Sequence, residues 1–361
     1  MKVIQVIPAF RLAGAEVMCE NLCVALKNAG VDVIAVSLYS ENTAITDRLD
    51  KKGVRIEYLD KKPGFDASVI IKLVHLFKKE KPDVVHTHIY ASKYALPAAA
   101  IAGVKKKIHT VHSMAQKEQG SLGKKVNTFL YRHCGVVPVA LSNEVKKSIG
   151  EVYGLQESII PVVYNGIDLS KCIRKNDYEA NGVFTIVHVG RFMKVKNHKT
   201  LIRAFARFAE KKESIRLQLL GEGELLDEMK DYAEKLKVAD KVEFLGLQSN
   251  VYPYLNKADV FCLPSEYEGV PMTLIEAMGT GLPIIASDVG GIPDMLMDQK
   301  DALLIAPKEE NILVALESIY SDEEKRKRLG RNAWDKSAVF SAITMAKKYA
   351  DIYENISEGG V

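Results

Sequence analysis

The chain has 361 residues, of which 47% are hydrophobic, so it is long and apolar enough for two domains with sizeable cores. Its formal charge of +4 is too small to suggest a highly charged, unfolded chain. The longest apolar candidate, residues 95–104, is too short to span a membrane, and the apolar run at residues 3–8 is too short for a signal peptide.

Charge is distributed unevenly along the chain. Lys and Arg outnumber Asp and Glu by eight in residues 1–171, whereas the acidic residues lead by four in residues 172–361. A basic first half suggests contact with an anionic surface or substrate. Random variation in surface charge is the alternative.

The five cysteines include no Cys-x-x-Cys pair, which favours free thiols in a reducing compartment. Cys19 and Cys23 are four residues apart, on one face of an expected helix, as in ordinary core packing. With no signal peptide, we expect a cytoplasmic protein.

The first half alternates between strand and helix patterns. Strands are predicted at residues 3–8, 31–38, 54–59, 82–88, 107–112, 136–141 and 159–163, and helices at residues 16–28, 67–79 and 92–102. This alternation predicts a doubly wound parallel sheet. His86 and His88 share one face of a strand, but no acidic residue or cysteine nearby completes a metal site.

Residues 105–133 are rich in basic side chains. Lys124 and Lys125 alternate with Val126 and Phe129 at helical spacing, and three consecutive lysines lie just upstream. A basic amphipathic helix can lie on an anionic membrane or bind a lipid-diphosphate acceptor. It can equally be a domain helix with a solvated basic side, and the sequence leaves both readings open.

After the polar stretch at residues 170–182, which predicts a linker, the alternation resumes. Strands are expected at residues 184–190, 216–220, 242–246, 259–263 and 283–287, and helices at 200–209, 308–320, 322–337 and 341–356. We therefore expect one domain over residues 1–170, joined by the helix in residues 341–361, and a second domain over residues 171–340.

The stretch at residues 264–279 is the strongest candidate site. A strand, a Gly/Pro loop and a helix from Met272 place a helix N-terminus at the carboxyl end of a parallel strand, where anions bind. Glu268 and Glu276 bracket this position. Carboxylates would repel a phosphate, so they more plausibly accept hydrogen bonds from hydroxyl groups. Phosphate on the amides and hydroxyls on the acids together describe a nucleotide sugar.

The run Ser-Glu-Tyr-Glu-Gly-Val-Pro-Met-Thr-Leu-Ile-Glu-Ala-Met at residues 265–278 resembles the Glu-x7-Glu signature of the retaining group 1 glycosyltransferases. The resemblance implies an α/β protein of the GT-B fold, with two Rossmann-like domains that face each other across a cleft and a C-terminal helix that crosses back to the first domain. The alternative is an ordinary βα unit in which Glu276 faces solvent.

The resemblance also implies roles for individual residues. Arg191 and Lys196 would bind the diphosphate, Glu268 the donor sugar, Glu276 the ribose, and His112 the sugar's hydroxymethyl group. A planar guanidinium and a point charge suit a departing nucleoside diphosphate. Further donor contacts are expected from the loops and helix starts at Gly14, Gly246, Gly269, Val270, Met272 and Thr273.

The expected activity is transfer, with retention, of a hexose or N-acetylhexosamine from a nucleotide diphosphate sugar, with UDP favoured, to a hydroxyl of a glycan or lipid-linked glycan. The chain has no Asp-x-Asp pair, so we expect neither a metal nor a cofactor. Contact with the inner face of a membrane through residues 105–133 is a further expectation, and nucleic acid is not. A sugar-nucleotide epimerase of similar fold and a non-catalytic nucleotide-sugar-binding protein are the alternatives.

Overall fold

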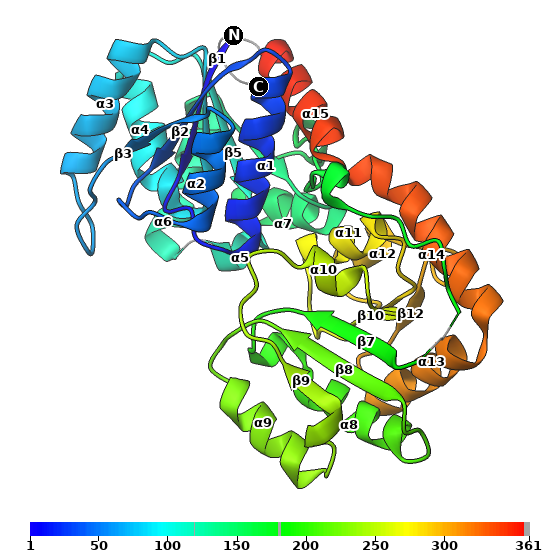
Figure 1. The fold of residues 1–361 in the computed structure, drawn as a ribbon. Coiled ribbons are helices and arrows are strands. Elements are labelled where there is room, and N and C mark those ends of the chain that lie inside the picture. Colours follow the sequence, from blue (N-terminus) through cyan, green and yellow to red (C-terminus); the bar gives the residue numbers. More distant parts are fainter. Residues whose placement is uncertain (119, 180–181, 357–361) are drawn as a thin grey trace. The chain divides into compact units, whose positions relative to one another are not determined.

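The computed structural model describes residues 1–118, 120–179 and 182–356. The chain forms two compact units (Figure 1). Unit 1 comprises Met1–Ile167 and the chain from Ser341 onward, and unit 2 comprises Asp168–Phe340.

Unit 1 is built on one six-stranded sheet whose neighbouring strands are all parallel, in the order β3-β2-β1-β4-β5-β6. Its strands are β1 (Lys2–Ile7), β2 (Asp32–Ser37), β3 (Arg55–Tyr58), β4 (Val84–His88), β5 (Lys106–Val111) and β6 (Val136–Ala140). Its helices are α1 (Gly14–Asn28), α2 (Ala44–Lys51), α3 (Ser68–Glu80), α4 (Ser92–Ile101), α5 (Ala115–Glu118), α6 (Ser121–His133), α7 (Asn143–Tyr153) and α15 (Ala342–Asn355).

The prediction of a strand at residues 159–163 is wrong. Val162 forms only an isolated bridge with Ala140 at the sheet edge. Pro161 has no N–H group and so cannot donate to a continuous ladder, which explains why this apolar run does not become a seventh strand. Helices α2 and α7 were not predicted.

Unit 2 repeats the same architecture, with parallel strands in the order β12-β11-β10-β7-β8-β9. Its strands are β7 (Phe184–Val189), β8 (Ile215–Leu220), β9 (Val242–Phe244), β10 (Val260–Leu263), β11 (Ile284–Ser287) and β12 (Leu303–Ile305). Its helices are α8 (His198–Ala209), α9 (Leu226–Lys235), α10 (Tyr252–Leu255), α11 (Met272–Gly279), α12 (Ile292–Met295), α13 (Glu309–Ser321) and α14 (Glu323–Ser337).

Each sheet, with its strands numbered within its own unit, has the order 3-2-1-4-5-6 of a doubly wound nucleotide-binding fold. In such sheets the chain reverses its direction of winding between the first and fourth strands. Ligands bind beyond the carboxyl ends of these two strands. The reversal falls between β1 and β4 in unit 1, and between β7 and β10 in unit 2.

Apolar side chains at helical spacing fix the helices to these sheets. In α8, Leu201, Phe205 and Phe208 are fully buried on one face and belong to the core of unit 2. Burial of each such side chain contributes about 1.5–3 kcal/mol. This packing, repeated along both sheets, makes their carboxyl edges rigid platforms for the loops that follow.

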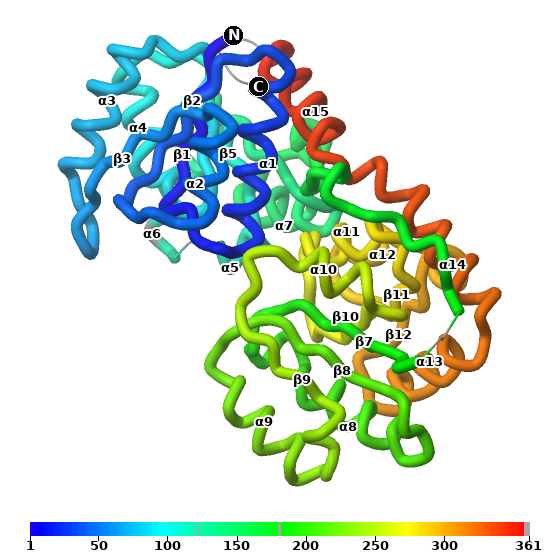
Figure 2. The backbone as a smooth tube through the Cα atoms, in the orientation of Figure 1, coloured from blue at the N-terminus to red at the C-terminus, as the bar shows by residue number. Residues whose placement is uncertain are grey.

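Helix α15 completes unit 1 although about half the chain separates it from the rest of that unit. It packs against α1, and the tube view shows the two running side by side (Figure 2). Ile167 pairs with Ser341, and a Cβ on Gly166 would lie 2.6 Å from the Ser341 carbonyl oxygen. The close approach of the chain here therefore requires glycine.

None of the helices in the described part of the chain is both long enough and apolar enough to cross a membrane.

Candidate active site

Lys196 and Glu268 meet where the winding of unit 2 reverses. Lys196 lies in the loop after β7 and Glu268 in the loop after β10, and these strands are neighbours in the sheet. The Lys196 Nζ atom lies 2.6 Å from the Glu268 Oε1 atom. The structure thus brings together two predicted site residues that are 72 positions apart.

Backbone contacts hold these two loops together. The Glu266 N–H group donates to the Val195 carbonyl at 2.8 Å. Asn197 adopts a left-handed conformation with φ of 58°, and its amide donates to the carbonyls of Pro264 and Pro307, both at 3.1 Å. Asparagine tolerates this conformation better than most residues. Asn197 was not predicted as a site residue, although an Asn after a Lys at a helix start is a local signal that was available.

Glu268 is a buried carboxylate with several partners. The Ser265 hydroxyl donates to Glu268 Oε1 at 2.6 Å, alongside Lys196, and Ser265 is itself fully buried. The Glu268 carbonyl accepts from Gly291 N–H at 3.0 Å. A Cβ on Gly290, where φ is +58°, would lie 1.8 Å from that carbonyl oxygen. Only glycine fits there, so the loop after β11 fixes the position of Glu268.

Helix α11 begins beside this carboxylate. Pro271 precedes it in an extended conformation, and the N–H groups of Leu274 and Ile275 donate to the Pro271 carbonyl. The N–H groups of Met272 and Thr273 have no acceptor within the helix, as at any helix start. Two free amides and the positive end of a helix dipole are groups that can bind an anion. Gly269 and the buried Val270 lead into it.

Arg191 follows β7 directly and its side chain is exposed. Its loop passes so close to the loop after β8 that a Cβ on Gly221 would lie 2.1 Å from the Gly190 carbonyl oxygen. The Gly221 N–H group in turn donates to the Gly246 carbonyl at 2.8 Å. Arg191 and Gly246 therefore lie on the same carboxyl edge of the sheet. No ion pair joins the Arg191 guanidinium to another described residue.

Glu276 is the fifth residue of α11, and its side chain is partly buried. Burial raises the pKa of the Glu276 carboxyl to about 7, and the nearby Lys171 opposes that rise. The Glu276 charge contributes to raising the pKa of the Tyr252 and Cys172 side chains, after burial itself. Glu276 is therefore a carboxyl group that exchanges a proton near neutral pH.

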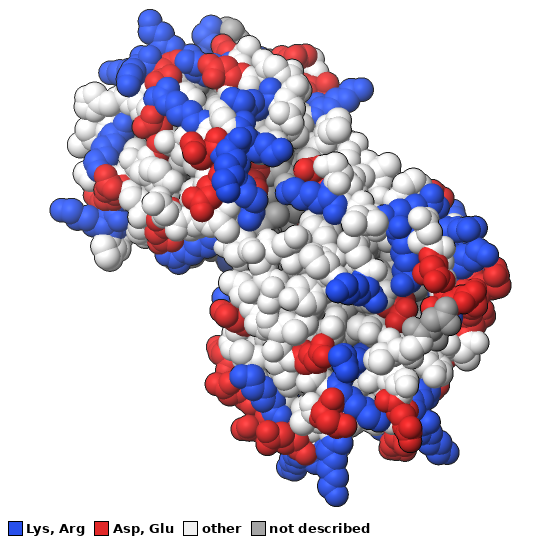
Figure 3. Space-filling model, in the orientation of Figure 1, with Lys and Arg blue, Asp and Glu red and all other residues white. Residues whose placement is uncertain are grey.

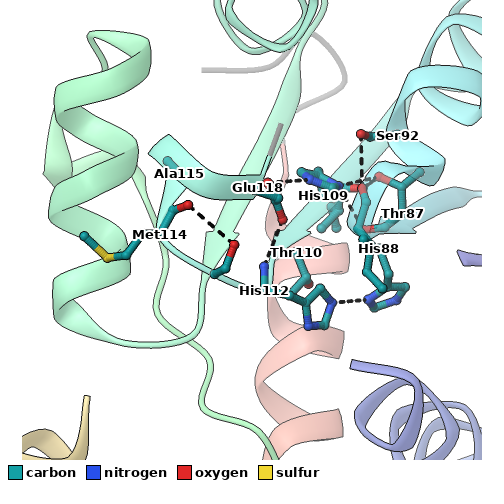
Figure 4. Close-up of polar contacts among 12 residues, drawn as sticks. Thr87, His88, Ser92, His109, Thr110, His112, Met114, Ala115 and Glu118 are labelled. Carbon is teal, nitrogen blue, oxygen red and sulfur yellow. Dashed lines mark hydrogen bonds and ion pairs between the residues drawn. The ribbon is translucent and has the colours of Figure 1, made fainter. Parts of the chain in front are cut away.

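In unit 1, His112 follows β5 and is held at two points (Figure 4). Its backbone N–H group donates to Glu118 Oε1 at 2.9 Å, and its ring Nε2 atom lies 3.0 Å from His88 Nδ1. The other oxygen of Glu118 contacts His109 Nε2 at 3.3 Å. Burial lowers the pKa of His112 to about 3, so its ring is neutral at physiological pH.

The two histidines of β4 form hydrogen bonds with other side chains, so they are not an open pair of metal ligands. His86 contacts the Tyr353 and Thr110 hydroxyls, at 2.8 and 2.7 Å, and His88 contacts Gln5 at 2.8 Å. Within the described ranges, no cluster of three or more His, Cys, Asp or Glu residues could hold a metal ion.

Gly14 is the first residue of α1, so the helix begins two residues earlier than predicted. Ala13 before it is extended and provides no side-chain cap. The loop after β1 thus presents the first-turn amides of α1 at the carboxyl edge of unit 1, next to β4, where the winding of this sheet reverses.

Basic residues in the segment 105–133 are only partly available to a ligand. The buried Lys107 donates to the Val104 and Lys105 carbonyls, Lys106 to the Tyr353 carbonyl, and Arg132 to the Tyr153 carbonyl. Figure 3 shows Lys and Arg mixed with Asp and Glu over unit 1. In the described part of this segment the exposed lysines are Lys105, Lys117 and Lys125, and Phe129 is exposed as well.

Fold and site together define a two-unit α/β protein with a helix N-terminus and a carboxylate–ammonium pair where one sheet reverses its winding. Two family models agree with this description: "Glycosyltransferase Family 4" matches residues 12–171, and "Glycosyl transferases group 1" matches residues 172–336. The chain belongs to the group 1 glycosyltransferases, and its fold is GT-B.

The chain is similar to bacterial proteins that are named as glycosyltransferases. Over 80% of this chain and 79% of the relative, the chain is 29% identical to a UDP-Gal:α-D-GlcNAc-diphosphoundecaprenol α-1,3-galactosyltransferase of Escherichia coli. Over 52% of this chain and 51% of the relative, it is 32% identical to a diphospho-undecaprenol 4-α-N-acetylgalactosaminyltransferase of Campylobacter jejuni.

Solved structures share the fold. An Anabaena protein, HepE, crystallised with UDP, matches with a TM-score of 0.82 at 18% identity, over 98% of this chain and 100% of that one. The lipopolysaccharide outer core galactosyltransferase WaaB matches with a TM-score of 0.75 at 21% identity, over 98% and 99%. At these identities the likeness concerns the fold.

Glu276 makes the stability of unit 2 depend on pH. Its pKa is about 7 in the folded protein and 4.5 in the unfolded chain, so between these values the folded state binds more protons. The free energy of unfolding should therefore fall as pH rises from 4.5 to 7. Glu276→Gln should remove this part of the fall, measured by urea unfolding followed through Trp334, the single tryptophan of the chain.

Glu224→Gln, which changes an exposed glutamate of the same unit, is the control and should keep the pH dependence of the parent. If Glu276→Gln and the parent protein change in parallel between pH 4.5 and 7, the assignment of this titration to Glu276 is wrong.

Proposed function

We propose that this protein is a retaining, metal-independent glycosyltransferase. It transfers a hexose or N-acetylhexosamine from a UDP-sugar to a hydroxyl group of a glycan or lipid-linked glycan, in the synthesis of a polysaccharide or glycoconjugate. The observation that carries the proposal is the Lys196–Glu268 pair beside the start of α11.

These residues supply what departure of a nucleoside diphosphate needs. Lys196, Arg191 and the amides of Met272 and Thr273 stabilise the negative charge that develops on the diphosphate. Each preorganised donor of this kind contributes about 2.7–4 kcal/mol to transition-state stabilisation, by analogy with oxyanion-hole deletions. Lys196 and Arg191 provide the positive charge that a metal ion can provide in other enzymes. The sequence has no Asp-x-Asp pair to bind such a metal ion.

Two carboxylates orient the donor. The hydrogen bonds that Glu268 accepts from Lys196 and Ser265 both go to Oε1, so Oε2 is the oxygen that accepts from a sugar hydroxyl. Glu276 accepts from the ribose hydroxyls in its ionised form, and His112 binds the hydroxymethyl group of the donor sugar. Amides at Gly14, Gly246, Gly269 and Val270 complete the donor contacts.

Retention does not need a carboxylate nucleophile in this proposal. The acceptor hydroxyl attacks on the face from which the diphosphate leaves, and its proton passes to the departing phosphate oxygen. A double displacement would instead require a carboxylate positioned behind the sugar carbon, as in retaining glycosidases. We assign no such residue, because Glu268 is already held by Lys196 and Ser265.

The choice of substrates follows the relatives. The Escherichia coli and Campylobacter jejuni enzymes are named for acceptors in which a sugar is joined to diphosphoundecaprenol, and the first is named for a UDP-sugar donor. The excess of basic residues in the first half of this chain suits a diphosphate-bearing acceptor. The free cysteines are consistent with a reducing cytoplasm, where we place the reaction.

A donor screen tests the proposal directly. The purified protein is incubated with UDP-glucose, UDP-galactose, UDP-N-acetylglucosamine, UDP-N-acetylgalactosamine or GDP-mannose, with EDTA present, and free nucleotide diphosphate is measured. We expect slow release from one UDP-sugar, accelerated by a lipid-linked glycan. Release that stops in EDTA would refute metal independence. Turnover that added glycan never accelerates would favour the epimerase, and neither release nor a thermal shift with UDP would refute the proposal.

Lys196→Ala should lower kcat by about 10²–10³-fold with a much smaller rise in the KM for donor, because its ammonium acts mainly on charge that develops in the transition state. Lys194→Ala is the matched control. Lys194 lies in the same short turn, Lys194–Lys196, but is exposed, and its loss should leave kcat nearly unchanged. An unchanged kcat in Lys196→Ala would remove Lys196 from the mechanism.

We also propose peripheral contact with an anionic membrane through α6, where Phe129 is 59% exposed beside Lys125. The protein should sediment with vesicles that contain anionic lipid and not with neutral vesicles. Phe129→Ser with Lys125→Ser should reduce binding severalfold, and the exposed pair Ile71→Ser with Lys78→Ser on α3 is the control. Equal binding of all three proteins would refute this contact.

A further inference from the structure

A buried chain of hydrogen bonds joins His112 to the last helix of unit 1. From His112 Nε2 it runs to His88 Nδ1 at 3.0 Å, from His88 Nε2 to Gln5 Oε1 at 2.8 Å, and from Gln5 Nε2 to the Tyr353 hydroxyl at 3.0 Å. Gln5, His88 and Tyr353 are fully buried. Loss of any one partner would therefore leave a buried polar group unsatisfied, at a cost of about 1–3 kcal/mol.

The direction of this chain follows from the chemistry of its members. The Gln5 amide nitrogen donates to Tyr353, so its oxygen faces His88 and can only accept. His88 must therefore carry its proton on Nε2. A neutral imidazole has one donor and one acceptor nitrogen, so His88 Nδ1 accepts and His112 Nε2 donates.

We propose that Gln5 and Tyr353 act as positioning residues that hold His112 in the tautomer protonated on Nε2. In that tautomer His112 Nδ1 carries a lone pair, and it accepts a hydrogen bond from a hydroxyl of the donor sugar. This inference rests on the proposed function for the identity of the hydroxyl, but the tautomer itself is a property of the free protein.

The orientation of the Gln5 amide is the deciding element, although Gln5 does not touch His112. If the amide turned over, its nitrogen would face His88, every hydrogen bond in the chain would reverse, and His112 would present an N–H group in place of the lone pair. The Tyr353 hydroxyl, which accepts from this amide, also meets His86 Nδ1 at 2.8 Å, so a reversal would have to change the tautomer of His86 as well. His86 continues to Thr110 at 2.7 Å, and Thr110 to the Tyr349 hydroxyl at 2.7 Å.

Burial supports the assumption that these histidine rings are neutral. His86 packs against the Tyr349 and Tyr353 rings and against His88, and desolvation lowers the pKa of both imidazoles. Each neutral ring carries one proton, so this chain of hydrogen bonds can adopt either of two tautomeric arrangements and carries no net charge. A charged His112 would donate from both nitrogens and could not accept a hydrogen bond from a sugar hydroxyl.

The test begins with 15N NMR of the histidine side chains in the free protein, in which protonated and unprotonated ring nitrogens have distinct shifts. His112→Gln identifies the His112 signals. We expect an unprotonated Nδ1 and a protonated Nε2 in the parent. In Tyr353→Phe the amide loses its acceptor, and the signals should shift towards a mixture of tautomers. A His112 that is protonated on Nδ1 in the parent would overturn the proposal.

Tyr349→Phe is the matched control, because it removes a second buried hydroxyl from the same helix, four residues earlier and at the far end of the network. It should leave the His112 signals unchanged. The same two variants are then assayed with the donor identified by the screen. Tyr353→Phe should lower kcat/KM for donor by about tenfold, the equivalent of one hydrogen bond, and Tyr349→Phe should not.

A donor in which fluorine replaces the hydroxyl of the hydroxymethyl group tests the direction of the last bond. Fluorine cannot donate a hydrogen bond. With the parent protein, kcat/KM for this fluoro sugar should therefore fall as far as it does for a second sugar donor that carries hydrogen in place of the same hydroxyl. With the fluoro sugar, His112→Ala should cause no further loss of kcat/KM. Full activity with the fluoro donor, or a shifted tautomer in Tyr353→Phe without loss of kcat/KM, would overturn the role of the network. If the protein turns over no donor at all, the NMR result still decides the tautomer, and the proposed function alone has failed.

Discussion

The buried carboxylate of Glu268 imposes the strongest constraint on unit 2. A carboxylate removed from water needs a cation and hydrogen-bond donors close by, or it destabilises the fold. Lys196 and Ser265 meet that need from two directions. The order of the strands brings the two loops that carry these groups together, and Gly290 in the neighbouring loop allows the close approach to the Glu268 backbone.

The contacts of Lys196 bear directly on the proposed function. Its Nζ atom lies 2.6 Å from Glu268 Oε1, so under that proposal the ammonium is held by a fixed acceptor and needs little further ordering to bind a diphosphate. The Glu268 carboxylate then keeps its hydrogen bond from Ser265 when the ammonium binds phosphate. One ion pair would thus serve both the folded chain and the binding of the donor.

Much of this could be predicted from the sequence because it is local. Alternating apolar runs indicate parallel sheets, and the spacing of Glu268 and Glu276 indicates the family. What failed depends on partners far away along the chain. The apolar run at residues 159–163 forms no strand because of Pro161, and the charges of Lys107 and Arg132 are directed to backbone carbonyls.

Other features depend on partners that no local pattern shows. Asn197 clamps two loops whose prolines lie 67 and 110 residues further on, and Ser265 was recognised only as part of a motif. His112 was identified by resemblance, but the residues that hold its ring come from β1, β4 and α15. Only the folded sheet brings these segments together, so pattern reading along one stretch of sequence cannot reveal them.

The placement of α15 has a consequence for how the protein is made. Unit 2 is an insertion within unit 1, so a ribosome completes the whole of residues 168–340 before it adds the helix that unit 1 still lacks. Domains tend to fold as units in the order of synthesis. Unit 2 can therefore finish folding on the nascent chain, while unit 1 waits with its α15-binding surface on α1 uncovered until Tyr353 has emerged.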